Sequence, residues 1–171
     1  MNEYPLLFTI RELISGNGFL AGVIGRGRCL MVNEGPDEGR WLYGVQPGGI
    51  AESGETPQEA YLRFVVALRN ALADMAALSP DFDTFHESAI SFFCEIDRED
   101  QGRWDAAVAK VRSGAAVEPS LSSLPRERAE TPCEVQVLAV SPQVDVTPQW
   151  NSSESFAVPV SSAAPRRTAT A

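Results

Sequence analysis

Residues 6–13 are rich in β-forming side chains, and Phe8 and Ile10 alternate with Thr9 and Arg11, a period of two that is typical of β-strands. The pattern predicts three strands, over residues 6–13, 19–32 and 41–45, and a bend at Gly25-Arg26-Gly27 divides the second. The turns between them are short and rich in Gly and Asn, so we expect antiparallel pairing. In the third strand Trp41, Tyr43 and Val45 should share one face.

The period changes to that of a helix after Thr56. Thr56-Pro57-Gln58-Glu59 is a capping box, in which Thr56 caps the helix and Glu59 returns to the cap amide. The helix should run to about Leu78, and six apolar residues form one stripe for the core: Tyr61, Phe64, Val65, Leu68, Leu72 and Met75. A second row, Leu62 and Val66, either widens this core face or docks another chain.

Two further helices and one strand are predicted after Ser79-Pro80. The first helix spans residues 81–96, with an aromatic side formed by Phe82, Phe85, Ala89, Phe92 and Phe93. A charged loop over 97–102 leads to a shorter helix that buries Trp104, Ala107, Val108 and Val111 and stops near Gly114. Residues 134–140 could return as an edge strand.

These elements predict an α+β fold. An antiparallel sheet of three to four strands carries the long helix on one face, in a β-β-β-α-β core with two additional helices. We expect residues 1–114 to form the domain and residues 115–171 to form an extended C-terminal segment with one strand (134–140) and a flexible tail.

Composition narrows the function classes. The net charge is −9, from 14 basic and 23 acidic residues, which argues against a free-standing nucleic-acid binder and suits a basic partner. No stretch is apolar for long enough to span a membrane. Cys29, Cys94 and Cys133 are odd in number and far apart, so we interpret them as reduced, mostly buried thiols of a cytoplasmic protein.

The segment around Glu52, Glu55 and Glu59 resembles the start of a Nudix box, which binds magnesium and hydrolyses diphosphate derivatives. The rest of that box is missing, because Phe64, Val66 and Ala67 occupy the positions of its later carboxylates. His86 is the only histidine, and we interpret it as a packing or surface residue. We therefore predict no catalytic, cofactor-binding or metal residue. A divergent Nudix-like metal-dependent hydrolase using the three glutamates remains the alternative.

A second resemblance covers residues 28–75. Pro47-Gly48-Gly49 followed by Gly54-Glu55-Thr56-Pro57-Gln58-Glu59-Ala60 resembles the HicB antitoxin family, with Glu55 in place of the usual aspartate. The resemblance implies a partial RNase H-like fold, no cofactor and no catalysis. It also implies the antitoxin of a type II toxin-antitoxin pair, which binds and neutralises a small basic mRNA-cleaving toxin.

The chain departs from that family in two places. The helices over residues 81–113 are not part of the minimal HicB domain, and residues 115–171 show no helix-turn-helix or ribbon-helix-helix pattern. We therefore do not expect direct DNA binding. A self-associating structural module, forming a homo-oligomer through a sheet edge or through the Leu62 and Val66 row, is a further alternative.

Overall fold

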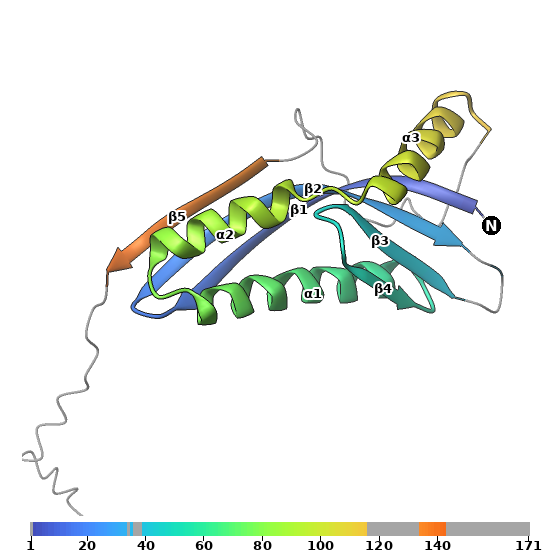
Figure 1. Ribbon diagram of the computed structural model, residues 1–171. Coiled ribbons are helices and arrows are strands. Elements are labelled where there is room, and N and C mark those ends of the chain that lie inside the picture. Colours follow the sequence, from blue (N-terminus) through green and yellow to red (C-terminus); the bar gives the residue numbers. More distant parts are fainter. Residues whose placement is uncertain (1, 34, 36–38, 116–133, 143–171) are drawn as a thin grey trace, which may run out of the picture.

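The computed structural model of the protein describes residues 2–33, 35, 39–115 and 134–142. Within them the chain forms five strands and three helices, in the order β1 (Asn2–Gly16), β2 (Phe19–Asn33), β3 (Arg40–Gln46), β4 (Ala51–Gly54), α1 (Pro57–Leu78), α2 (Phe82–Cys94), α3 (Arg98–Arg112) and β5 (Glu134–Pro142). The α+β fold class is confirmed: the strands form one antiparallel sheet, and helices pack against it (Figure 1).

Strand β2 is the centre of the sheet. It pairs with β1 along its whole length on one side. On the other side its first half, from Phe19 to Arg26, pairs with β5, and its second half, from Arg28 to Asn33, pairs with β3. The predicted return of residues 134–140 to the sheet is therefore confirmed, although the strand extends to Pro142. The tail expected after it lies outside the described residues.

The bend expected at Gly25-Arg26-Gly27 is wrong, because β2 continues through these residues as one unbroken strand. The glycines allow close contacts instead of turning the chain. A Cβ on Gly25 would lie 2.3 Å from the Phe93 ring. One on Gly27 would lie 2.1 Å from the backbone carbonyl oxygen of Gln46 and 2.6 Å from the ring of Phe8, its cross-strand neighbour. Gly25 and Gly27 are therefore required for close packing, because neither position has space for a side chain.

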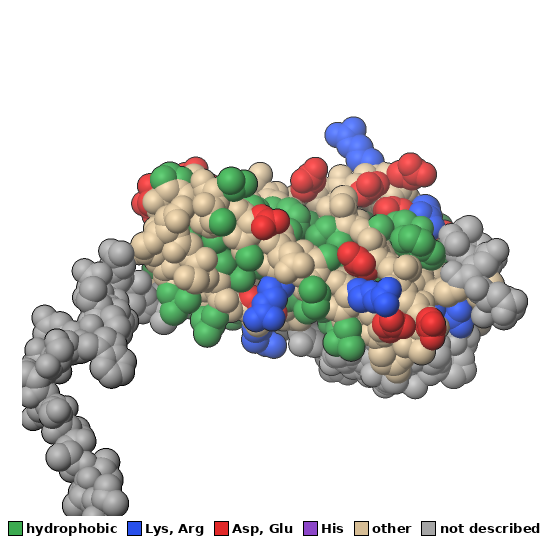
Figure 2. Space-filling view, turned by 90° about the horizontal axis from the view of Figure 1, so that it is seen from below, with side chains coloured by type: hydrophobic (Ala, Val, Ile, Leu, Met, Phe, Trp, Pro, Cys, Tyr) green, Lys and Arg blue, Asp and Glu red, His purple; other side chains and the backbone are tan. Residues whose placement is uncertain are grey.

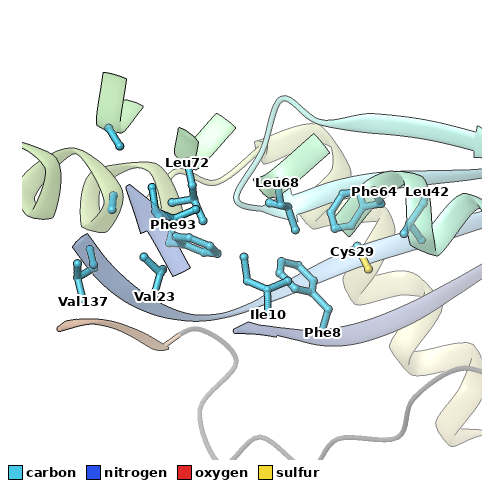
Figure 3. Packing of buried hydrophobic residues seen from close by; sticks show 14 of the residues in the cluster. Phe8, Ile10, Val23, Cys29, Leu42, Phe64, Leu68, Leu72, Phe93 and Val137 are labelled. Carbon is cyan, nitrogen blue, oxygen red and sulfur yellow. The ribbon is translucent and has the colours of Figure 1, made fainter. Parts of the chain in front are cut away.

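The main core lies between the sheet and the pair α1 and α2 (Figure 3). Phe64, Leu68 and Leu72 of the predicted α1 stripe are fully buried, while Tyr61, Val65 and Met75 are partly buried around them. From α2, Phe85, Ala89 and Phe93 complete this cluster. The rings of Phe8 and Phe64 meet edge to face, with centroids 5.3 Å apart.

A smaller core covers the opposite face of the sheet, under α3. Trp41, Tyr43 and Val45 do share a face there and pack with Trp104 and Ala107. Both faces of β2 are thus buried near residues 29–32, which explains the unbroken apolar run Cys29-Leu30-Met31-Val32. Val111, expected to be buried, is 44% exposed.

The loop predicted over residues 97–102 is also wrong, because α3 already begins at Arg98. Asp97 is the N-cap, and its carboxylate accepts hydrogen bonds from the amides of Glu99 and Asp100 at 2.9 and 3.0 Å. Acidic residues are favourable in a first helical turn, because its free amides carry partial positive charge. The charged run that suggested a loop is therefore a helix start.

Candidate functional site

The segment that resembles two families forms the junction between β4 and α1. Residues 51–54, for which the sequence predicted no strand, form a short strand that pairs with β3 at the edge of the sheet. Thr56 Oγ1 then accepts from the amide of Glu59 at 3.2 Å, as the capping box predicts. The return bond differs by one residue, because Glu59 Oε2 accepts from the amide of Glu55 at 2.9 Å.

Arg63 joins this cap to the edge strand. Its guanidinium donates to Glu59 Oε1 at 2.5 Å and to the backbone carbonyl of Ser53 at 3.0 Å. Glu59 and Arg63 are four residues apart on one helix, a spacing at which side chains of opposite charge are close enough to pair. Glu59 is therefore engaged twice, by an amide and by an arginine, and Arg63 protects one carbonyl of a sheet edge.

The three glutamates of the Nudix-like pattern do not converge. Glu55 and Glu59 line a hollow of about 350 Å³ with Trp41 and Arg63. Glu52 lines a different hollow of about 310 Å³, with Leu62, Arg63 and Val66. Nowhere in the described ranges do three carboxylate, thiol or imidazole groups gather as they would around a metal ion. This arrangement offers no feature that favours the hydrolase alternative.

The row formed by Leu62 and Val66 is not part of the core. Leu62 is 63% exposed and Val66 is 53% exposed, so the interpretation of this row as a wider core face is wrong. Seen from the α1 side, hydrophobic side chains stand between arginine and carboxylate side chains (Figure 2). We call Glu52, Glu55, Leu62, Arg63 and Val66 the α1–β4 surface.

The hollows include residues that the sequence pattern does not mark as functional. Trp41 is predicted only as a strand residue, and Asn70 was not singled out, yet each lines one of the two hollows. Arg63 had a recognisable signal, since it follows Glu59 by four residues on a predicted helix. No comparable signal identifies Trp41, because its place beside the helix start depends on the pairing of β3 with β4.

His86 and the cysteines fall elsewhere. The His86 ring packs at a tilt of 35° against the ring of Phe82, with centroids 5.8 Å apart, as expected for a packing residue. Cys29 is buried without a disulfide, and burial raises the pKa of its thiol far above the usual range. Cys94 is exposed, which contradicts the expectation of burial. It is the last residue of α2 and follows buried Phe93, so its side chain leaves the helix on a different side from that of Phe93. Cys133 is outside the described residues.

None of the described helices is both long and apolar enough to cross a membrane. Comparison with known proteins gives no match to any family model, curated protein or solved structure.

Proposed function

We propose that this chain is a non-enzymatic, HicB-like antitoxin that binds and neutralises a small basic mRNA-cleaving toxin through the α1–β4 surface. The observation that carries the proposal is the exposure of Leu62 and Val66 beside Glu52, around one hollow. Exposed apolar side chains framed by carboxylates suit a partner that supplies an apolar anchor and basic side chains.

The charge of the surface supports a basic partner. Glu52 and Glu55 are acidic residues of this surface, while Arg63 is already neutralised by its ion pair with Glu59. The whole chain carries a net charge of −9, which would attract a basic protein from a distance. Such steering raises the association rate and weakens as salt is added.

The local structure also fits the resemblance on which the proposal rests. Pro47-Gly48-Gly49 follows a sheet strand, and Thr56 caps a long helix that packs on that sheet. The segment acts as a turn and a helix cap, and Glu59 serves that cap. These roles require no metal and no bond-breaking step.

The test is co-expression and pull-down with the basic product of an adjacent reading frame, together with rescue of growth arrest caused by that product. Leu62→Asp should weaken binding by about 2 kcal/mol or more, the size of an interface hot spot, which is about thirtyfold in Kd. Leu78→Asp is the matched control, because Leu78 is an 86% exposed leucine of the same helix outside the surface.

A charge reversal separates the electrostatic contribution. Glu52→Lys should slow association and flatten its dependence on salt. Equal binding by native chain, Leu62→Asp and Glu52→Lys would remove the α1–β4 surface from the proposal. No binding and no growth rescue by the native chain would remove the antitoxin function itself.

A further inference from the structure

The outer edge of β1 is a long strand edge. β1 spans 15 residues, from Asn2 to Gly16, and it pairs with β2 alone among the described strands. An edge strand presents backbone N–H and C=O groups that can pair with another chain. The opposite end of the sheet differs, since β4 has only four residues and Arg63 occupies one of its carbonyls.

The hairpin register tells which residues of β1 face outward. Gly16 and Phe19 flank a two-residue loop, and such a loop closes on a pair that exchanges both hydrogen bonds. Even-numbered residues of β1 therefore bond to β2, and odd-numbered residues direct their backbone groups to the outer edge. Pro5 agrees with this assignment, because proline has no N–H and is tolerated only where none is needed.

We propose that two copies of this chain pair antiparallel through their β1 edges, with a two-fold axis at Ile10, to form one continuous sheet. In this register Leu7 lies opposite Leu13 of the second copy, and Thr9 lies opposite its Arg11. Leu13 is 66% exposed, so the pairing would cover a leucine that stands in solvent in the single chain. This inference is independent of the proposed toxin partner.

The sequence of β1 favours this register over its neighbours. An axis at Thr9 would place Pro5, which cannot donate, opposite Leu13. An axis at Arg11 would place Leu13 opposite Thr9 and Leu7 opposite Ser15, so neither leucine would face the other. The axis at Ile10 places Pro5 opposite Ser15, which leaves an uninterrupted ladder from Leu7 to Leu13, longer than the ladder from Leu7 to Arg11 that an axis at Thr9 leaves. It also pairs leucine with leucine. An identical strand is therefore a suitable occupant of the edge.

The first test compares two proline variants by light scattering. The native chain should have close to twice its 18.5 kDa mass at micromolar concentration. Thr9→Pro removes an outward N–H inside the ladder and should give a monomer that still unfolds cooperatively. Ser15→Pro removes an outward N–H beyond the ladder and should remain a dimer. A monomeric native chain, or a dimeric Thr9→Pro chain, would overturn the inference.

A second test does not require Thr9→Pro to fold. In a background with Cys94→Ser and Cys133→Ser, Leu7→Cys together with Leu13→Cys should give a covalent dimer on mild oxidation. Opposed residues of a hydrogen-bonded antiparallel pair are about 5.5 Å apart between Cα atoms, which suits a disulfide. Leu13→Cys alone should stay uncrosslinked, since Leu13 does not face itself. Equal crosslinking of the single and double variants would exclude this register.

Discussion

The Phe93 ring of α2 lies against the backbone of Gly25 in β2, where a Cβ would come within 2.3 Å of ring carbon Cζ. Both residues are buried in the main core, and Phe93 is fully enclosed. The contact holds α2 close to the half of β2 that also pairs with β5. Glycine at this strand position is therefore a packing requirement.

Gly25→Ala should destabilise the protein by about 1–3 kcal/mol, because a methyl group is forced into a filled space. Denaturant unfolding followed by fluorescence measures the loss. Gly102→Ala is the control, since no atom lies within 4 Å of a Cβ there and alanine suits the interior of α3. It should stabilise by about 0.5–1 kcal/mol. If Phe93→Leu fails to relieve the Gly25→Ala loss in the double variant, the contact is not its cause.

The side chain of Asn17 links the β1–β2 hairpin to the end of α1 by hydrogen bonds. Its side-chain Nδ2 donates to the carbonyls of Ala77 and Ser79, each at 3.0 Å. Asn17→Ala should cost about 1–3 kcal/mol, because it removes two hydrogen bonds worth about 0.5–1.5 kcal/mol each, and should speed amide exchange at the end of α1. Asn17→Asp retains size and turn preference but cannot donate and places a negative charge beside two carbonyl oxygens, so its stability should be no higher than that of the alanine variant. A fully stable aspartate variant would show that these bonds contribute nothing.

Thr56→Ala should also cost about 1 kcal/mol, because the Glu59 amide loses its capping acceptor. Thermal unfolding measures the change. Thr56→Ser keeps the hydroxyl and should retain most of the stability. An unchanged melting temperature in the alanine variant would mean that the hydrogen bond from the Glu55 amide to the Glu59 carboxylate suffices as a cap.

Asp81 gives α2 an acid-sensitive start. The Thr84 amide donates to its carboxylate at 2.8 Å, and this bond lowers the pKa of Asp81 below its usual value. A group with a lowered folded pKa adds stability above its unfolded pKa, near 3.8, and loses that stability as the pH falls through the folded value. Asp81→Asn retains an acceptor for the cap but has no carboxyl group to titrate. Stability profiles of the two chains should therefore diverge below about pH 4, and parallel profiles would contradict this account.

The sequence predicted α1 better than it predicted any other element. Thr56, Pro57 and Glu59 mark its start with specific chemistry, and Ser79-Pro80 marks its end, so its bounds match the structure. Strand β4 was missed because Ala51-Glu52-Ser53-Gly54 has no alternation or β-branched residues, and only its pairing with β3 makes it a strand. Likewise, Gly25 and Gly27 resemble a bend until the rings that fill their space are known.

The candidate site was predictable only in part. The spacing of Leu62 and Val66 allowed two interpretations, and their exposure excludes the core-face interpretation, because α1 turns Phe64 and Leu68 toward the sheet instead. Glu52 lies in β4, whereas Glu55 follows that strand, next to the cap of α1. The two glutamates therefore line different hollows. A pattern of residue types cannot show this separation, because it depends on which side of an edge strand each residue takes.

The division of β2 between two partner strands has a consequence for synthesis on the ribosome. β1, β3 and the helices emerge early, but the half of β2 from Phe19 to Arg26 gains its second neighbour only when residues 134–142 have been made. Val137, which closes the main cluster over Val23, arrives with them. A nascent chain therefore carries an unsatisfied strand edge beside an incomplete core until residues 134–142 emerge, and in that interval pairing with other nascent chains competes with folding.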